Sequence, residues 1–225
     1  MTTGRPAPPP AWTGCAPHSP TATEPPDPSG APAPSGPPAR ARAPPRFPIA
    51  SAGRPPGRIR SGTGWTQIGG AATTLHAAAA GLFATNPADG GIHRYNGTPN
   101  SWTRIGNAGA AFAVNNNALY GLTPDRSAVM RWTGSGDRWE QVGGPAAALY
   151  AGGTSMVATD PHDGDVFRFN GTPGAWTQIG GAGAHFALSG THIYGLTPTR
   201  SAVTVRTGSG WNGIGGAAAQ IAAGR

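Results

Sequence analysis

The chain has little charge, almost no cysteine and no long apolar run. Only 11% of its 225 residues are charged, and all 16 basic residues are arginine, so lysine is absent. A single cysteine, Cys15, excludes an internal disulfide framework and any zinc cluster built from cysteines. Because no stretch of about 18 apolar residues occurs, we expect no membrane-spanning helix.

The first ten residues also lack the apolar core of a signal peptide and are rich in proline instead. The sequence alone therefore leaves the cellular location open. An extracellular protein is expected if the true start of translation lies upstream of Met1.

Glycine and proline are abundant, and proline divides the chain in two. Of the 25 prolines, 18 lie in residues 1–64. Residues 1–57, rich in proline, alanine and arginine, have too little apolar surface to offset the entropy of folding, so we predict a disordered tail there. A net charge of +7 is compatible with nucleic-acid binding. Residues 1–64 carry +5 of that charge, however, and we do not expect a nucleic-acid partner.

A repeat occupies residues 58–225. Five near-identical phrases, from WTQIGG to WNGIGG, begin at tryptophans that are 37, 37, 37 and 35 residues apart. Between them, short apolar runs alternate with turn residues, which predicts about four short strands in each unit. The segments 86–90 and 160–164 combine Pro with Asp-Gly and are predicted hairpin loops. The tryptophans are Trp65, Trp102, Trp139, Trp176 and Trp211.

Four short strands in about 37 residues predict an all-β fold, a β-propeller built of four-stranded blades. Units one and three resemble each other, as do units two and four, so the full period is a double blade of about 74 residues. Residues 58–64 resemble the closing strand at 203–210, and residues 211–225 open another blade. The expected plan is five blades or an incomplete six, of which alternation favours six. A ring left open would expose strand edges and self-associate.

The W-x-x-I-G-G phrase, the L-Y-x-x-x-P strand and the closing R-Y-N-G or R-W-T-G strand resemble the tectonin β-propeller repeat. The resemblance covers residues 58–225. It implies a lectin that recognises glycans or glycoconjugates between or along the blades. We accordingly expect a carbohydrate-binding module that binds multivalently, through similar pockets around the ring.

Two sets of residues are candidates for contact with a sugar. The repeat tryptophans could stack on a pyranose ring, but structural anchoring between blades is the preferred interpretation. The second set is an arginine followed by an aromatic residue on the last strand of a unit, a pairing that suits either a polar glycan pocket or an exposed outer strand. The candidates are Arg94, Tyr95, Arg131, Trp132, Arg168, Phe169, Trp65, Trp102, Trp139 and Trp176.

The sequence offers no catalytic or cofactor motif, so we expect neither an enzyme nor a cofactor. Asp160, Asp163 and Asp165 superficially resemble a calcium loop, but a hairpin turn is preferred and no metal site is predicted. The other functions considered are a protein-interaction scaffold, a truncated propeller without specific binding, and RNA binding by the tail. RNA binding would weaken steeply with salt.

Overall fold

The computed structural model describes residues 56–61 and 64–224, with the backbone alone for residues 56–61. The predicted tail, residues 1–57, therefore lies almost wholly outside the described residues. The described part is all β, as expected, and contains 18 strands and no helix. It accordingly has no helix that could span a membrane.

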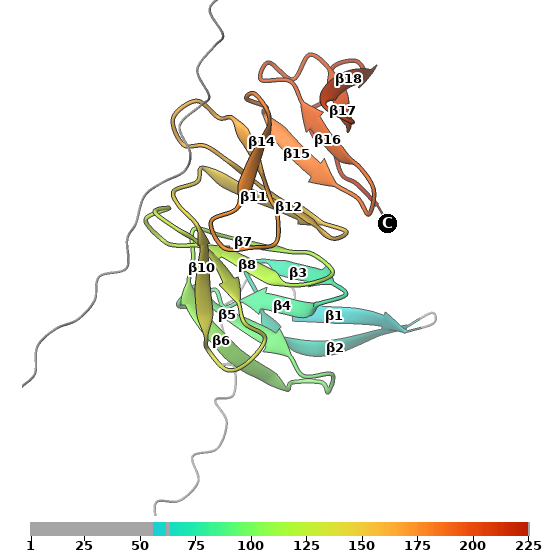
Figure 1. The fold of residues 1–225 in the computed structure, drawn as a ribbon. Helices are drawn as coiled ribbons and strands as arrows, with labels where there is room; N and C mark the ends of the chain where they lie inside the picture. Colours follow the sequence, from blue (N-terminus) through green and yellow to red (C-terminus); the bar gives the residue numbers. More distant parts are fainter. Residues whose placement is uncertain (1–55, 62–63, 225) are drawn as a thin grey trace, which may run out of the picture. The chain divides into compact units, whose positions relative to one another are not determined.

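The strands form four antiparallel sheets of four strands each and one hairpin (Figure 1). In every sheet the strands pair in chain order, so each sheet is a meander that corresponds to one propeller blade. The hairpin pairs β1 (Pro56–Ser61) with β2 (Gly64–Ala71). Sheet 1 contains β3 (Leu75–Ala78), β4 (Gly81–Thr85), β5 (Gly91–Tyr95) and β6 (Trp102–Ala108), and sheet 2 contains β7 (Ala111–Val114), β8 (Leu119–Leu122), β9 (Val129–Trp132) and β10 (Trp139–Gly143). Sheet 3 contains β11 (Ala148–Gly152), β12 (Ser155–Thr159), β13 (Val166–Phe169) and β14 (Trp176–Gly180), and sheet 4 contains β15 (His185–Leu188), β16 (Ile193–Leu196), β17 (Val203–Thr207) and β18 (Gly210–Gly215).

The hairpin β1–β2 is the outer half of a further blade. In β1–β2, Arg60 pairs with Trp65, just as Arg206 pairs with Trp211 in sheet 4. This register confirms that residues 58–64 contain a closing strand. The strand begins at Pro56, two residues before the predicted boundary.

The hairpin loops between the second and third strands form where glycine and proline predict them. Asn86 and Gly90 close the loop of sheet 1 by a backbone hydrogen bond of 2.8 Å, and Asp160 and Gly164 close that of sheet 3 at 3.2 Å. Gly90 has φ of 69° and Gly164 has φ of 78°, which a residue with a side chain adopts only with strain. The Asp-Gly pairs are thus needed by the turns themselves.

The Trp-x-x-Ile-Gly phrase is explained by contacts between neighbouring sheets. The indole nitrogen of Trp102 donates to the carbonyl oxygen of Ile68, 2.8 Å away and 34 residues earlier. Its ring lies against Gly69, where an added Cβ would be 2.8 Å from the indole nitrogen. Ile68 itself is buried, with only 1% of its surface exposed. The tryptophan of one phrase thus packs on the preceding phrase. It bonds to the isoleucine carbonyl there and lies over the glycine, which has no side chain to block it.

The same contact recurs along the chain. Trp139 donates to Ile105 at 2.7 Å, Trp176 to Val142 at 2.8 Å and Trp211 to Ile179 at 2.8 Å. Successive sheets are therefore held in one repeated relationship, which accounts for the constant 37-residue spacing.

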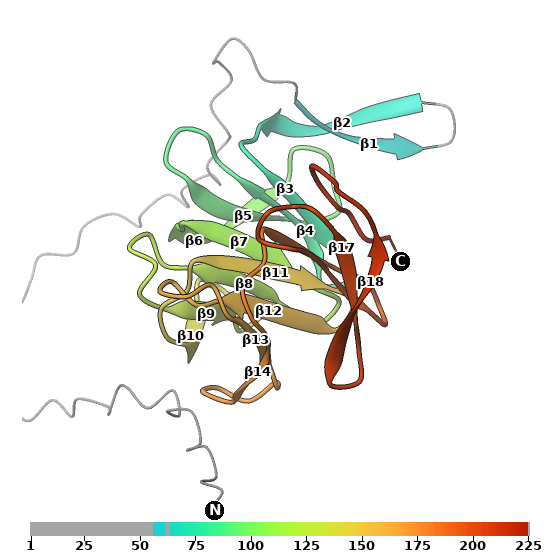
Figure 2. The same cartoon turned by 90° about the horizontal axis from the view of Figure 1, so that it is seen from above.

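The innermost strands of successive sheets contact one another: β3 with β7, β7 with β11, and β11 with β15. Figure 2 shows the first three of these strands. All of these innermost strands line a common cavity of about 370 Å³ together with residues 221–223. Residues 218–219 are held like the start of sheet 3. Ala218 N donates to Arg200 O at 3.2 Å, as Ala146 N donates to Arg126 O at 3.1 Å. The end of the described chain therefore occupies an inner-strand position of a further blade.

Candidate functional site

A cavity of about 840 Å³ lies between sheets 2 and 3. Its walls come from β8, β9 and β10 of sheet 2, from β12 and β13 of sheet 3, and from the turns at one end of these strands. The volume falls within the range of small-ligand pockets, about 300–1,000 Å³. Four of the predicted binding residues line this cavity: Arg131, Trp132, Arg168 and Phe169.

The arginine–aromatic pairs make contacts between sheets rather than within one strand. The guanidinium carbon of Arg94 lies 5.7 Å from the ring centroid of Trp132, in the next sheet. That of Arg131 lies 5.9 Å from the ring centroid of Phe169, again in the next sheet. Both distances are within the range of cation–π attraction. An arginine of one unit thus meets the aromatic residue of the following unit.

The rings of Tyr120 and Phe169 form the apolar floor of the cavity, whereas the ring of Trp132, which also lines it, packs against Phe83 of sheet 1. Trp132 is 9% exposed and Phe169 is 8% exposed. Tyr120 packs edge-on against Phe169, with ring centroids 6.1 Å apart, and burial raises the pKa of its hydroxyl. The indole nitrogen of Trp132 donates to Gly136 O at 2.9 Å, which fixes this ring within its own sheet. The floor is therefore preorganised.

Polar side chains surround this floor. Asn117, Thr154 and Asn170 line the cavity from three turns and are exposed. Behind them lies Asn115, fully buried, whose amide nitrogen donates to Ser155 O at 3.3 Å and joins sheet 2 to sheet 3. An apolar floor with hydrogen-bonding groups at the rim is the arrangement expected for a ligand with many hydroxyl groups.

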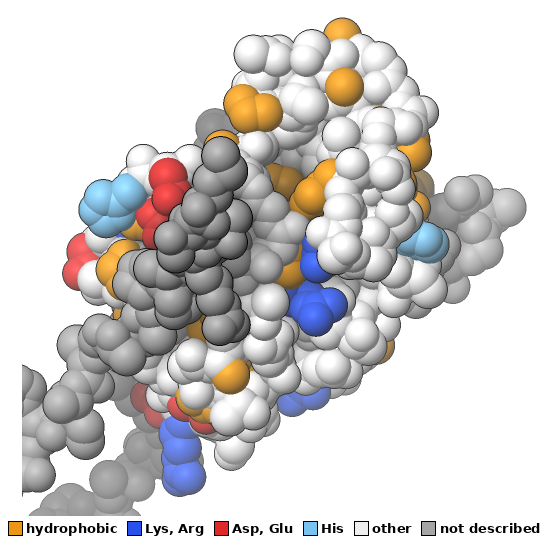
Figure 3. Space-filling model, turned by 45° about the horizontal axis from the view of Figure 1, so that its top comes forward, with side chains coloured by type: hydrophobic (Ala, Val, Ile, Leu, Met, Phe, Trp, Pro, Cys, Tyr) orange, Lys and Arg blue, Asp and Glu red, His pale blue; other side chains and the backbone are white. Residues whose placement is uncertain are grey.

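Two arginines and one glutamate line the cavity, and the glutamate pairs with one of the arginines. Arg131 Nε donates to Glu140 Oε1 at 2.6 Å, and Arg131 Nη1 donates to Gly171 O at 3.3 Å. Glu140 thereby neutralises Arg131. Arg168 is exposed and forms no ion pair with any described residue. Figure 3 shows basic side chains beside apolar ones at the edge of a hollow on one face.

The repeat tryptophans lie outside this cavity. Trp102, Trp139 and Trp176 each pack between sheets, with the indole nitrogen bonded to a backbone carbonyl. Tyr95 packs on Trp102, with ring centroids 5.1 Å apart, and does not line the cavity. Trp65 is 62% exposed. The structure thus brings together only part of the predicted set.

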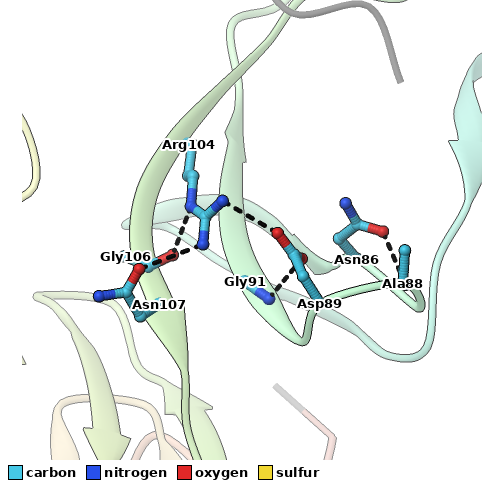
Figure 4. A network of polar contacts seen from close by, with 7 residues as sticks. All are labelled: Asn86, Ala88, Asp89, Gly91, Arg104, Gly106 and Asn107. Atoms are coloured by element: carbon cyan, nitrogen blue, oxygen red, sulfur yellow. Dashed lines mark hydrogen bonds and ion pairs between the residues drawn. The ribbon is translucent and has the colours of Figure 1, made fainter. Parts of the chain in front are cut away.

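A second polar cluster surrounds the loop between β4 and β5 of sheet 1 (Figure 4). Arg104 Nη1 contacts Asp89 Oδ2 at 2.9 Å, and Asp89 Oδ1 accepts from Gly91 N at 2.9 Å. The hydrogen bond to Gly91 is the main cause that lowers the pKa of Asp89. These contacts brace the hairpin loop.

The corresponding loop of sheet 3 contains Asp160, Asp163 and Asp165. Asp160 Oδ1 accepts from His162 N at 2.7 Å, and Asp163 Oδ1 accepts from Asp165 N at 2.9 Å. Burial and the two neighbouring carboxylates raise the pKa of Asp165. Among the described residues, no group of three or more His, Cys, Asp or Glu is placed to hold a metal ion. The backbone bond from Gly164 N to Asp160 O, at 3.2 Å, closes this loop as a hairpin turn.

Several residues at the cavity were missed from the sequence. Asn117 and Thr154 lie in turns and carry no motif. The sequence does distinguish Glu140, because WEQVGG has glutamate where the other four phrases have threonine or asparagine. A departure from an otherwise regular repeat pointed to the one acidic residue that lines the cavity.

Comparisons with known proteins add little to this geometry. No family model matches the sequence, and no curated protein matches it. Among solved structures, the chain is similar to the crystal structure of Myxococcus xanthus glutaminyl cyclase, at a TM-score of 0.37 and 18% identity. The similarity covers 60% of this chain and 64% of that chain, less than two thirds of its length. A likeness at this level identifies neither a family nor an activity.

Proposed function

We propose that this chain is a non-catalytic, lectin-like module whose partner is a glycan or glycoconjugate, bound in the cavity between sheets 2 and 3. The observation that carries the proposal is the composition of that cavity. Two aromatic rings form its floor, and amides, hydroxyls and arginines form its rim. A sugar presents apolar C–H groups and many hydroxyls, which these two kinds of surface complement.

The junction between sheets 1 and 2 has a related arrangement. Arg94 lies over Trp132 there, and Phe83 packs edge-on against the same ring, with centroids 5.9 Å apart. In the proposal this junction is a second, weaker site. Two sites on one chain would raise the apparent affinity for a polymeric glycan over that for a monosaccharide.

The test is binding of the full chain to a panel of immobilised neutral and acidic polysaccharides, with free monosaccharides as competitors. A Thr154→Trp variant places a bulky ring at the exposed rim of the cavity. We expect this variant to bind its polysaccharide about tenfold more weakly or worse, which corresponds to about 1.4 kcal/mol.

The matched control is Thr191→Trp. Thr191 is also exposed and occupies the same position as Thr154, one repeat of 37 residues later, in sheet 4. It does not line the cavity between sheets 2 and 3. Equal binding by the wild type and Thr154→Trp would exclude this cavity as the site. Absence of binding to every polysaccharide would overturn the proposed function.

A further inference from the structure

Two arginines of the closing strands occupy equivalent positions in neighbouring sheets. Arg94 pairs across sheet 1 with Phe83, and Arg131 pairs across sheet 2 with Tyr120. Each guanidinium lies over an aromatic ring of the next sheet, so each faces the junction that follows its own sheet. Arg131 is therefore the arginine that faces the cavity between sheets 2 and 3, where its ring partner Phe169 also lies.

The residue opposite this arginine on the last strand differs between sheets. In sheet 2, Glu140 pairs with Arg131, whereas in sheet 1 Thr103 pairs with Arg94. In sheet 3 the equivalent residue is Thr177. Among these three sheets, only sheet 2 has a carboxylate opposite its arginine. The cavity thus contains a charged pair that the neighbouring junctions lack.

The arginine–glutamate pair has polar atoms to spare. Nε and Nη2 of Arg131 both lie 2.6 Å from Oε1 of Glu140. No described residue donates to Oε2 of Glu140. The side chain of Arg131 is 27% exposed and that of Glu140 is 38% exposed, and both line the cavity. Oε2 is therefore an accessible acceptor, next to a guanidinium that has further N–H groups to donate.

The charges that face the cavity cancel. Glu140 is the one acidic residue among those that line it. Arg168 also lies at its edge, but it shares a face of sheet 3 with Val157 and Val166, which pack with Phe186 of sheet 4. The guanidinium of Arg168 therefore belongs to the junction with sheet 4. The arginine–glutamate pair accounts for the charge that faces the cavity, and this pair is neutral overall.

We infer that the cavity between sheets 2 and 3 selects a neutral sugar, and that Glu140 and Arg131 bind two adjacent hydroxyls of it. This inference rests on the proposed function and names its ligand class. A hydroxyl both donates and accepts, so a carboxylate oxygen beside a guanidinium N–H complements two neighbouring hydroxyls. A uronate in the same place would bring its carboxylate to Glu140, and two like charges in contact disfavour binding.

The test measures binding of the full chain to immobilised dextran, mannan and galactan, with soluble oligosaccharides as competitors. A galacturonate trisaccharide and its fully methyl-esterified form share every ring hydroxyl and differ in charge. Competition reports the sugar site itself, so attraction of an anion to the arginines of residues 1–57 is not scored. We expect the ester to compete at least about threefold more effectively than the acid, as for one exposed charge interaction.

Glu140→Gln keeps the shape of the side chain and removes its charge. We expect this variant to bind the neutral polysaccharide about tenfold more weakly, the loss typical of one charge-assisted hydrogen bond. It also leaves the charge of Arg131 uncompensated, so the acid should now compete better than the ester. A residue that only supported the fold would not reverse this preference.

The matched control is Asp89→Asn. It removes the carboxylate of another arginine pair, Arg104 with Asp89 at 2.9 Å, in the loop between β4 and β5. Neither the affinity for the neutral polysaccharide nor the preference for the ester should change. Circular dichroism and thermal melts of each variant confirm that it is folded, so that an unfolded protein is not scored as a loss of binding.

The outcomes distinguish this inference from the proposed function. Competition by the acid as strong as that by the ester in the wild type, or unchanged neutral binding in Glu140→Gln, would overturn the inference. Equal losses in Glu140→Gln and Asp89→Asn would show a general effect of charge and also overturn it. Binding to acidic polysaccharides alone would overturn the inference and leave a lectin of acidic specificity. No binding to any polysaccharide would overturn both.

Discussion

The indole nitrogen of Trp139 donates to the carbonyl oxygen of Ile105, 2.7 Å away and 34 residues earlier. This bond joins sheet 2 to sheet 1. The ring of Trp139 also packs against Phe112, with centroids 6.2 Å apart. Stability of the fold therefore depends on contacts between sheets as well as on the pairing within them.

Replacing Trp139 with Phe should destabilise the protein. The substitution keeps an aromatic ring but removes the donor to Ile105 O, next to a side chain that is 2% exposed. Leaving a buried carbonyl without its donor costs about 1–3 kcal/mol. Urea unfolding monitored by circular dichroism measures the change. Trp65→Phe is the matched control, because Trp65 begins an equivalent phrase but is 62% exposed, and it should change stability by less than about 0.5 kcal/mol.

Glycine is required where a tryptophan of the next sheet covers it. A Cβ added to Gly143 would lie 2.8 Å from Trp176 Cζ2 and 3.0 Å from its Cε2. Gly143→Ala should therefore displace the indole and cost about 1–3 kcal/mol. The control is Gly216→Ala, whose added Cβ would meet no described heavy atom within 4 Å. Thermal melts that rank the two variants equally would contradict the proposed role of the glycine.

Stability should fall as the solution becomes mildly acidic. His93 is 8% exposed, and burial lowers its pKa from the usual 6.5, with Arg104 adding to the effect and Asp89 opposing it. The unfolded chain then binds more protons than the folded chain once the pH drops below about 6.5. The stability contributed by neutral His93 is present above that pH and is lost as the pH falls toward the lower pKa of the folded state.

His93→Phe should reduce this dependence on pH. Sheet 3 has Phe167 at the same position, since His93 pairs with Ala84 and Phe167 with Ala158. The measurement is the free energy of unfolding at intervals from pH 7.5 to 5. The change of this free energy with pH should become smaller in His93→Phe. Part of it should remain, because burial also lowers the pKa of His76. The reciprocal variant Phe167→His should make the change with pH larger. An unchanged pH dependence in both variants would show that the acid sensitivity arises elsewhere.

Much of the fold was predictable because its determinants are local. The 37-residue recurrence of tryptophan and the turn residues between the apolar runs predict four strands per unit, and the structure has them in four sheets. The closing strand before Trp65 followed from its likeness to residues 203–210 and was confirmed by its register. These features depend on residues that are close in sequence or repeated at one interval.

The sequence by itself determined an all-β chain of repeated four-stranded units and a set of arginine–aromatic pairs. The tertiary structure decided which members of that set meet. Arg131 contacts Phe169 and not its chain neighbour Trp132, because alternate residues of a strand face opposite sides and the neighbouring sheet presents the equivalent position 37 residues later. It also placed the repeat tryptophans over glycines between the sheets and left Arg168 without the ring and carboxylate that Arg131 has. Such contacts join residues of different repeats, so only the packing of one sheet on the next could select them.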